Sequence, residues 1–476
     1  MLTAADVAKH DSKESCWVIV AGFVYDVTEF LNNHPGGAAS ILRYAGRMKD
    51  ATDEYNLFHA PTLILKELSK DKHLGPIDIQ QVIGAQHSAH SVEHDVMPLS
   101  ICQSLDDIRA AAEVKLSARA RTYFASGAES MTSVRNNRLH WEAISFYPRI
   151  LRNVSSLSMT CRVMGSPSSL PIFIAPAAAA KLGHPEGELC LARGAARMAI
   201  PQCVCTYSSF TNEEIVQCFE NEPLRRGGAL FFQLYVPKIK KEAEHLIKRA
   251  KSLNFQALVI TVDSPVIGKR EDDDRLRTST EHRNEIESQP PGKYLPGEEA
   301  PTLRGVHCST LEWSDIPWIR TLWGSKPIIL KGIQSAEDAY EATKHDLDGI
   351  YLSNHGGRQL DFAPSSVQTL LEINAKYPQV LKMLDIYVDG GVSRGSDVVK
   401  ALCLGAKAVG IGRGFMYALS AYGTDGVLRA IEFLSDEIQT TLRLLGVTDI
   451  AQLNPAYINT RRLANELGIG HVKAVI

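Results

Sequence analysis

The chain has 476 residues, more than one ordinary domain contains, so we expect one small domain and one large domain. Its 51 lysines and arginines stand against 54 acidic residues, and the net charge of −3 gives no reason to expect a nucleic acid or an anionic membrane as partner. The longest apolar run, Pro171–Ala180, is shorter than the roughly 20 residues that a membrane-spanning helix needs. We therefore expect a soluble protein whose partners are small molecules and other proteins.

The nine cysteines are scattered and odd in number, which does not fit the dense, even spacing of a secreted disulfide scaffold. A reducing compartment is therefore expected. Cys203 and Cys205 lack metal-ligand spacing and lie in an apolar run with strand character, which favours buried structural thiols. No arginine-rich leader precedes Leu2 and Ile476 does not complete a peroxisomal signal, so the cytoplasm is the expected compartment.

The texture of the sequence changes near its first sixth. Residues 1–75 form a polar and aromatic block, and residues 76–98 are poor in large apolar side chains. The second stretch carries three histidines, His87, His90 and His94. They could bind a metal ion, but no cysteine or second cluster completes a ligand set, so this stretch is interpreted as a solvated linker. Residues 99–476 are expected to form the large domain.

From Pro171 onward, short apolar runs with β character alternate with helix-like segments such as Glu186–Met198 and Lys238–Leu253. Continuous apolar strands separated by helices predict parallel pairing with right-handed crossovers, and eight such units predict an α/β fold, a closed (β/α)8 TIM barrel. A doubly wound sheet is the alternative fold. The predicted strands are Pro171–Pro176, Gln202–Thr206, Ala229–Tyr235, Gln256–Asp263, Pro327–Lys331, Gly349–Ser353, Asp385–Asp389 and Lys407–Gly412.

Polar side chains stand at or just beyond the ends of these strands. Because barrel enzymes hold their active sites where the strands end, we expect these side chains to converge on one mouth. The connection from Gly268 to about Gly305 is much longer than the others, which is typical of a lid or of a disordered loop, and the sequence does not distinguish the two. The polar residues are Gln233, Tyr235, Thr261, Asp263, Lys331, Ser353, His355 and Asp389.

The segment Tyr25–Gly37, which contains a His-Pro-Gly-Gly turn, and the later Phe58–Pro61 resemble the haem-binding signature of the cytochrome b5 family. The resemblance covers about residues 1–75 and implies a small α+β domain that binds haem b through His34 and His59. Two neutral imidazoles can hold haem iron from opposite faces, and the Pro-Gly-Gly turn directs the first histidine into a pocket. Since both axial positions of the iron would be filled, the expected role is electron transfer rather than oxygen chemistry.

The stretch from about residue 100 to residue 450 resembles the FMN-dependent L-2-hydroxy acid oxidising family, most specifically at Leu352–Asp361. Further motifs agree in order: Tyr123–Ala128, Phe232–Tyr235, Thr261–Asp263, Lys331-Gly332, Asp389–Gly391 and Gly410–Arg413. Together with the haem domain, the layout resembles the flavocytochrome b2 family. This implies oxidation of a small L-2-hydroxy acid, L-lactate first, with electrons passed through haem b to a cytochrome c-like acceptor.

Oxidation of a 2-hydroxy acid requires a group that fixes the carboxylate and a base that takes a proton. Arg358 can hold a carboxylate through two parallel hydrogen bonds. His355 suits the base because imidazole titrates near neutral pH, and Asp263 would orient it and stabilise its cationic form. The sequence leaves open whether His355 removes the Cα proton or the hydroxyl proton while a hydride moves. The resemblance adds three residues that contact the substrate, Tyr123, Tyr235 and Arg270.

The resemblance also implies the residues that bind FMN. Lys331 would stand beside the N1 region of the flavin and stabilise negative charge on the reduced ring. The backbone amides of Gly391 and Gly412, with the Arg413 guanidinium, would form the phosphate site after the last two strands. The other residues implied to bind FMN are Ala177, Cys205, Gln233, Thr261, Ser353 and Asp389.

Four positions depart from the family pattern. Cys205 stands where the family usually has a serine near the flavin, and Ser393 replaces an arginine that reaches the FMN phosphate, so weaker FMN binding is expected. Ala177 replaces a common threonine whose contact is mainly through the backbone. Tyr207 occupies the position that governs the size of the substrate side chain, where relatives carry leucine or tryptophan. Its ring favours a short substituent, such as the methyl group of lactate or the hydrogen of glycolate.

Two other functions stay open. One is an oxidase that passes electrons to oxygen and forms peroxide, against which the haem domain argues, since an oxidase needs no one-electron carrier. The other is a haem electron carrier whose barrel is inactive, against which the intact Tyr235, His355 and Arg358 argue. The resemblance implies a homotetramer through the tail from Gly446 onward, and a mitochondrial intermembrane-space location as the alternative to the cytoplasm.

Overall fold

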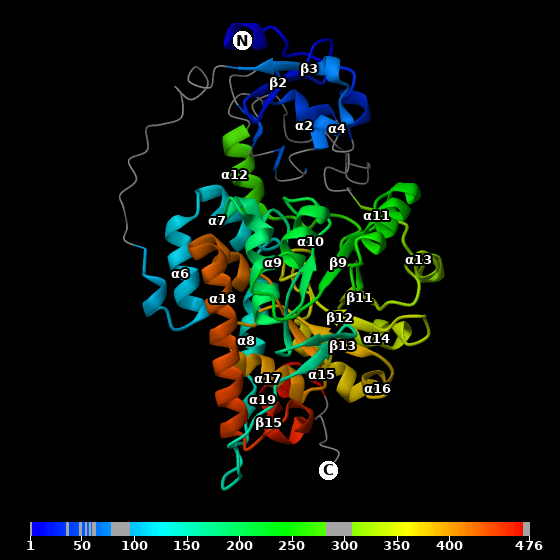
Figure 1. Cartoon of the computed structure of the whole chain (residues 1–476). Helices are drawn as coiled ribbons and strands as arrows, with labels where there is room; N and C mark the ends of the chain where they lie inside the picture. The colour runs from blue at the N-terminus through cyan, green and yellow to red at the C-terminus, as the bar shows by residue number, and fades with distance from the viewer. Residues whose placement is uncertain are drawn as a thin grey trace.

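A computed structural model of the chain describes residues 2–34, 38–46, 50–52, 55–56, 59, 63–77, 96–281 and 307–469. The predicted linker histidines His87, His90 and His94 lie outside the described residues, and so do Pro35–Gly37 and most of Phe58–Pro61. Figure 1 shows a small N-terminal domain at one end of a larger barrel. No helix in the described part of the chain is both long and apolar enough to span a membrane.

The small domain is built on a three-stranded antiparallel sheet in the order β1 (Trp17–Val20), β2 (Phe23–Asp26) and β3 (His73–Pro76). Ala21 and Gly22, which join β1 to β2, both have positive φ, 52° and 75°, as a two-residue type I′ hairpin turn requires. The short helices α1 (Ala4–Val7), α2 (Ala38–Leu42) and α4 (Leu63–Glu67) complete the α+β domain that the sequence predicts.

The large domain is a closed barrel of eight parallel strands, as predicted. The last strand pairs with the first, since Val409 lies opposite Ile172 and Ile411 opposite Ile174, and this closure rules out the doubly wound alternative. The strands are β7 (Ile172–Ile174), β8 (Gln202–Val204), β9 (Leu230–Tyr235), β10 (Leu258–Thr261), β11 (Ile328–Ile333), β12 (Gly349–Leu352), β13 (Asp385–Val388) and β14 (Ala408–Ile411). Each falls within, or within two residues of, its predicted range.

Helices surround the barrel. The two predicted helical segments are α9 (Gly187–Met198) and α11 (Lys240–Ser252). The others after β7 are α10 (Asn212–Glu220), α12 (Glu271–Glu281), α13 (Ile316–Trp323), α14 (Ala336–Ala342), α15 (Ser366–Lys376), α16 (Val380–Met383), α17 (Gly395–Cys403), α18 (Arg413–Leu444) and α19 (Arg461–Glu466). The helices α6 (Leu105–Lys115), α7 (Ala118–Ala125) and α8 (Thr132–Glu142) precede the barrel. The longest helix, α18, is interrupted at Tyr422 and Gly423, which have non-helical backbone angles.

The long connection after β10 is partly helical. Its first part forms α12, which the sequence did not predict, and residues 282–306 lie outside the described part of the chain. In Figure 1, α12 projects from the barrel on the side that faces the small domain. Since α12 follows the C-terminal end of β10, this is the face where a barrel enzyme holds its active site.

Large aromatic side chains fill the barrel interior. Phe173 packs edge-to-face against Tyr351 and Tyr387, with ring centroids 5.4 Å and 6.1 Å away, and all three residues are fully buried. A hairpin of β5 (Cys161–Val163) and β6 (Ser166–Ser168) adds Val163 and Met164 to this interior cluster. The Tyr387 hydroxyl accepts a hydrogen bond from the Met164 backbone, 2.8 Å away. The interior is therefore a packed core, as barrel enzymes that hold their active site at the mouth have.

We predict that Phe173→Ala will lower the free energy of unfolding of the barrel by about 3–5 kcal/mol, because it leaves a cavity that its ring-shaped neighbours cannot fill. Denaturant unfolding measures this change. Phe362→Ala is the matched control, because the Phe362 side chain is 70% exposed and its loss should change stability by no more than about 0.5 kcal/mol. Equal effects of the two substitutions would contradict a packed interior.

Candidate active site

A chain of three side chains lies at the mouth of the barrel. The Tyr235 hydroxyl at the end of β9 lies 3.0 Å from Nε2 of His355, which follows β12. Nδ1 of His355 lies 2.9 Å from Oδ1 of Asp263, which follows β10. An ionised carboxylate can only accept, so Nδ1 carries the hydrogen and Nε2 is left with a free lone pair. The Tyr235 hydroxyl therefore donates to the nitrogen that would act as a base.

The backbone after β12 explains why His355 points into the mouth. His355, Gly356 and Gly357 have positive φ values of 59°, 66° and 77°. Glycine adopts this conformation without steric cost, so two of the three positions are glycines and only the histidine carries a side chain. A Cβ at Gly357 would lie 2.6 Å from a methyl carbon of Val134. The His355 backbone N–H donates to the Ser353 hydroxyl, 3.0 Å away. This turn therefore holds the backbone of His355 in place and directs its side chain into the mouth.

Two further residues of the same motif support the turn. The buried amide groups of Asn354 and Asn137 exchange two hydrogen bonds of 2.8 Å and 2.9 Å, which tie the turn to α8. The Asp361 carboxylate accepts from the backbone N–H groups of Thr132 and Ser133 at the start of the same helix. Asn354 and Asp361 are therefore structural residues of the most specific motif.

The charges around His355 favour a carboxylate over a carboxylic acid. The Asp263 side chain has no exposed surface, and burial alone would raise its pKa. The pKa of Asp263 is nevertheless lowered, because the nearby His355 and Lys331 outweigh burial. Burial raises the pKa of Tyr235 well above its usual value, so its hydroxyl stays protonated. Asp263 is therefore an ionised acceptor and Tyr235 a neutral donor on the two sides of His355.

Two arginines flank one tyrosine beside this chain. The Arg358 guanidinium lies 4.9 Å from the ring centroid of Tyr123 and that of Arg270 lies 5.4 Å from it. Arg358 also donates to the backbone oxygens of Tyr123 and Ser126, at 2.7 Å and 3.2 Å. Burial, and then repulsion from Arg270, lowers the pKa of Arg358 to about 10. It remains cationic at neutral pH, and an anion bound here would offset the repulsion.

A second group of polar residues lies at the ends of β9, β10 and β11. The Gln233 side-chain amide donates to the Thr261 hydroxyl at 2.8 Å, and its oxygen accepts from the backbone of Thr206 at 3.2 Å. The buried Lys331 ammonium donates to the Ser353 hydroxyl at 3.1 Å and forms no ion pair with a carboxylate within the described ranges. A buried cation with spare donors fits a ligand that carries or develops negative charge.

The predicted position of Cys205 is also at this mouth. Its sulfur accepts a hydrogen bond from the Tyr207 backbone, 3.5 Å away, and burial raises the pKa of its thiol to about 12. Cys203 is buried too, and the nine cysteines are free thiols, as the sequence predicts. Ala177 lies between Ala175 and Ala179. The Ala175 backbone N–H donates a hydrogen bond to a backbone oxygen at the end of β14, and the Ala179 backbone N–H donates to the backbone oxygen of Tyr207.

Glycines and an arginine after the last two strands form a candidate phosphate site, which we call the phosphate cradle. Gly412 is the N-cap of α18, and a Cβ there would meet only the Ala175 side chain at 4.0 Å, so space is open before the helix N-terminus. The Arg413 guanidinium donates to the Gly356 oxygen at 2.6 Å, and burial lowers its pKa. Gly391, after β13, has a φ of 75°. Nearby, Oδ1 of Asp389 is buried and has no hydrogen-bond partner in the described part of the chain, as a site built for a polyhydroxyl ligand would leave it.

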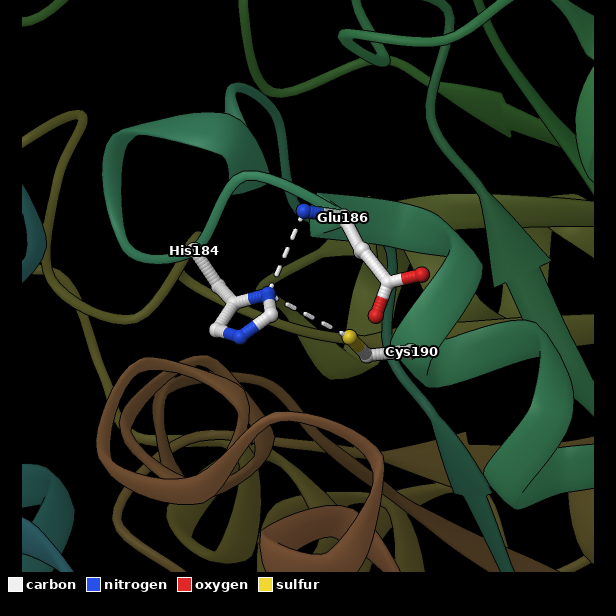
Figure 2. Close-up of side chains that lie close together, drawn as sticks. All are labelled: His184, Glu186 and Cys190. Carbon is white, nitrogen blue, oxygen red and sulfur yellow. Dashed lines mark hydrogen bonds between the residues drawn. The ribbon is translucent and has the colours of Figure 1, made fainter.

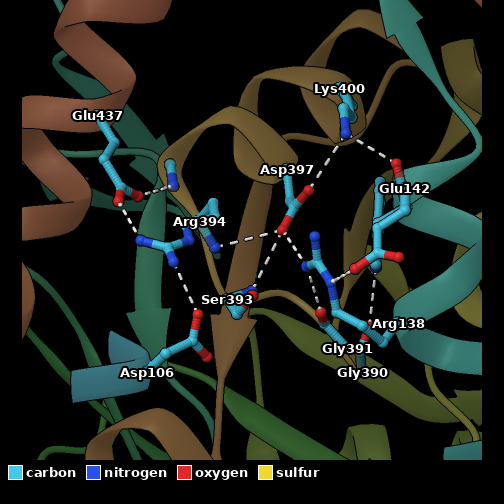
Figure 3. Close-up of polar contacts among 12 residues, drawn as sticks. Asp106, Arg138, Glu142, Gly390, Gly391, Ser393, Arg394, Asp397, Lys400 and Glu437 are labelled. Atoms are coloured by element: carbon cyan, nitrogen blue, oxygen red, sulfur yellow. Dashed lines mark hydrogen bonds and ion pairs between the residues drawn. The ribbon is translucent and has the colours of Figure 1, made fainter. Parts of the chain in front are cut away.

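Ser393 and Arg394 do not supply a further cation to this cradle (Figure 3). Arg394 is held by two carboxylates, 2.7 Å from Asp106 and 3.2 Å from Glu437. The backbone N–H groups of Ser393 and Arg394 both donate to Asp397, at the start of α17. Arg394 therefore cannot replace the missing arginine without breaking two ion pairs.

The two predicted haem ligands face each other in the small domain. The His34 and His59 rings have centroids 5.7 Å apart. Two imidazoles that each bind iron at about 2 Å have centroids separated by a similar distance, so the spacing fits a shared iron. Burial, and then the charge of His34, lowers the pKa of His59 to about 4, which keeps that ring neutral and able to bind a metal.

His307 belongs to the mouth, although the sequence did not predict it. Its ring is stacked on Tyr235 with a centroid distance of 4.4 Å and an interplanar angle of 2°. The Tyr207 ring lies 5.8 Å from His307 and 5.4 Å from Tyr235. We call Tyr207, Tyr235 and His307 the ring cluster. A lone histidine after a long loop carries no motif, so only the fold could reveal it.

A further group of possible metal ligands lies at the start of α9 (Figure 2). The ligand atoms of His184, Glu186 and Cys190 lie within 4.8 Å of one another. Nδ1 of His184 already accepts from the Glu186 backbone at 3.2 Å, and Glu186 pairs with Arg193 at 2.9 Å. Burial raises the pKa of Cys190 to about 11, so its thiol stays protonated. These contacts explain the three residues as parts of the turn that begins α9, without a metal ion.

Comparison with known families follows the division of the structure into two domains. Residues 112–460 match the family model described as FMN-dependent dehydrogenase, and residues 3–78 match that of the cytochrome b5-like haem/steroid binding domain. The two matches cover the barrel and the small domain. The residues at the barrel mouth and the facing histidines thus lie in the parts of the chain that carry these matches.

Individual relatives share one or both parts. The chain is 38% identical over 473 residues to an L-lactate dehydrogenase (cytochrome) of Wickerhamomyces anomalus, which covers 98% of this chain and 81% of the relative. It is 36% identical over 495 residues to the L-lactate dehydrogenase (cytochrome) of Saccharomyces cerevisiae, with the same coverage. Glycolate oxidase 1 of Zea mays is 37% identical over 360 residues, 74% of this chain and 95% of the relative.

Solved structures show the same likeness. A double mutant of flavocytochrome b2 with pyruvate bound has a TM-score of 0.70 and 35% identity, covering 80% of this chain and 95% of the other. A mandelate oxidase mutant with (S)-mandelic acid has a TM-score of 0.63 and 33% identity, covering 75% and 98%. The solved structures therefore share the fold of most of this chain, and the two L-lactate dehydrogenases (cytochrome) match nearly all of its sequence.

Proposed function

Because the chain belongs to the FMN-dependent dehydrogenase family and carries a cytochrome b5-like haem domain, we propose that it oxidises a small L-2-hydroxy acid such as L-lactate and passes the electrons to a cytochrome c-like acceptor. The observation that carries this proposal is the Tyr235–His355–Asp263 chain beside the Arg358 guanidinium. FMN and haem b are the cofactors. When bound, FMN takes two electrons from the substrate and haem b carries them away singly.

The cationic side of the mouth would hold the substrate carboxylate. Arg358 presents a planar guanidinium suited to two parallel hydrogen bonds, and Tyr123 lies against it with a hydroxyl of its own. Arg270 adds a second positive charge and is itself held by Asp273, 3.4 Å away. An anion at this place relieves the repulsion between the two arginines, so a carboxylate is bound more tightly than a neutral group of the same shape.

The base side of the mouth would then act on the carbon next to that carboxylate. Nε2 of His355 holds a lone pair because Nδ1 donates to Asp263, so it can take a proton from the substrate. Once protonated, the imidazolium lies against an ionised carboxylate that stabilises it. Tyr235 keeps its proton and can donate to the oxygen of the substrate hydroxyl. His355 is thus the base, the Asp263 carboxylate orients it, and Tyr235 is a neutral hydrogen-bond donor.

FMN would be held by the residues at the ends of the strands. Lys331, with Gln233 and Thr261, would line the ring, and the free oxygen of Asp389 suits the hydroxyl groups of the ribityl chain. The start of α18 and Arg413 would receive the phosphate. Haem b would be held between His34 and His59 in the small domain.

An oxidase that forms peroxide is the second candidate, favoured by the 37% identity to glycolate oxidase 1 of Zea mays. The observation that weighs against it is the pair of facing histidines, since a one-electron carrier serves a protein acceptor rather than direct transfer to oxygen. The two candidates differ in the fate of the electrons, which a single mixing experiment follows.

We also propose a homotetramer. The loop after β4 (Ser145–Phe146) exposes Ile150 by 82% and Leu151 completely, and the tail pairs with β4 through β15 (Ile458–Asn459). Exposed apolar side chains beside an ordered tail are typical of a surface covered by another subunit. Light scattering should give four times the mass of the chain, and the mass of a monomer would contradict the proposal.

Stopped-flow mixing of the holoenzyme with L-lactate tests the proposed reaction. We expect the flavin absorbance to bleach first and the haem to be reduced afterward. In His355→Gln, the rate of flavin reduction should fall at least about a hundredfold, the low end for a positioned acid–base group, while both cofactors are retained. His245→Gln changes an exposed histidine on α11 and should reduce at the normal rate. Stoichiometric peroxide with oxidised haem would favour the oxidase, and a normal rate in His355→Gln would remove that residue from the base role.

Restoring an arginine at residue 393 should tighten FMN binding. A hydrogen bond to a charged group contributes about 1.5–3 kcal/mol, so Ser393→Arg should lower the FMN dissociation constant roughly tenfold or more. Arg394 cannot already supply this contact, because Asp106 and Glu437 hold it. Fluorescence titration of the apoprotein measures the constant. Ser155→Arg adds the same charge at an exposed position and serves as control; an equal effect there, or none at residue 393, would contradict the prediction.

A further inference from the structure

The ring cluster places one unsatisfied polar atom beside the reactive histidine. His307 is only 6% exposed, and its Nε2 is buried without a hydrogen-bond partner among the residues that the structure describes. A buried acceptor that lacks a partner is unfavourable, and native structures rarely retain one unless a ligand or an ordered water meets it. The atom therefore points to a ligand group that the mouth is built to receive.

The hydrogen-bond character of this atom follows from its neighbour. Nδ1 of His307 lies 2.9 Å from the backbone oxygen of Ser264, which can only accept, so Nδ1 carries the hydrogen. Burial lowers the pKa of His307, which keeps the ring neutral at neutral pH. Nε2 is then an acceptor, and its natural partner is a neutral donor such as a hydroxyl group. A carboxylate would require the ring to be protonated, which burial opposes.

The position of the ring relative to the proposed substrate identifies the group that reaches it. The substrate carboxylate takes the Arg358 side, and the substrate hydroxyl takes the side of His355 and the Tyr235 hydroxyl. The side chain on the reacting carbon is then directed to the ring cluster, where His307 is stacked on Tyr235 at 4.4 Å. In this cluster the Nε2 atom is a buried acceptor to which the structure gives no partner among the described residues.

We propose that His307 is a specificity-determining residue that accepts a hydrogen bond from a hydroxyl group on the substrate side chain, so that the enzyme prefers a 2,3-dihydroxy acid to the matching acid with a methyl group. This inference rests on the proposed oxidation of a 2-hydroxy acid and names the substrate class of the same site. The short side chain that Tyr207 favours is kept, with one hydroxyl added to it.

L-lactate and L-glycerate differ by that single hydroxyl and have the same configuration at the reacting carbon. In the wild-type holoenzyme we expect kcat/KM for flavin reduction to be about 2- to 10-fold higher with L-glycerate, as one neutral hydrogen bond provides. L-malate, which offers a carboxylate instead, should be the poorest of the three. A wild-type preference for L-lactate or for L-malate would overturn the inference.

His307→Phe keeps a flat ring on Tyr235 and removes the acceptor. We expect the ratio of kcat/KM for L-glycerate over L-lactate to fall to about one, mainly through a higher KM for L-glycerate. A residue that only supports Tyr235 would instead change kcat for both substrates equally, and this result would overturn the inference. His245→Phe, at an exposed position on α11, should leave the ratio unchanged.

Two outcomes separate this inference from the proposed function. If the enzyme oxidises L-lactate but the ratio is unchanged in His307→Phe, the function stands and the role of His307 fails. If neither L-lactate nor L-glycerate reduces the flavin, both fail. Should His307→Phe not retain its cofactors, His307→Leu removes the same acceptor with less bulk, and the same fall in the ratio is expected.

Discussion

Closure of the parallel barrel is the constraint on which the rest of the structure depends. When Val409 of β14 pairs with Ile172 of β7, all eight strands are forced to end at one rim. Residues that are far apart in the sequence are then brought together by the closure of the barrel itself, before any contact between their side chains. Tyr235, Asp263 and His355 come from three different strand ends, and hydrogen bonds of 3.0 Å and 2.9 Å join them. The aromatic interior below the rim is packed with side chains, so the flavin and the substrate are expected at the rim.

Precision within the rim comes from local backbone geometry. The run of positive φ values at residues 355–357 costs conformational entropy and excludes most side chains, and the paired amides of Asn137 and Asn354 hold it against α8. The most specific motif of the sequence is therefore largely a device for placing one imidazole. Its two glycines, its asparagine and its aspartate are fixed by the turn, and its histidine and arginine act on the ligand.

The pattern of apolar runs was sufficient to predict the eight strands, because buried parallel strands have a signature that does not depend on distant residues. The convergence of polar residues followed from strand order alone. Two features could not be predicted. The α12 helix lies in a charged segment with no apolar stripe, and His307 acquires its meaning only from its stack on Tyr235. The place of Arg394 beside the phosphate cradle could be seen in the sequence, but its ion pairs with Asp106 and Glu437 are seen only in the structure.

The rim of the barrel carries more positive than negative charge. Arg358, Arg270, Lys331 and Arg413 bring four positive charges to the rim, whereas Asp263 and Asp273 are the carboxylates that pair with residues there. The pKa of Arg358 is lowered to about 10, first because burial opposes its charge and then because Arg270 repels it. Three of the predicted ligand groups carry or develop negative charge: the substrate carboxylate, the FMN phosphate and the reduced ring. The repulsion between these cations therefore favours the binding of such groups, whereas the neutral His307 can recognise a hydroxyl group on another side of the mouth.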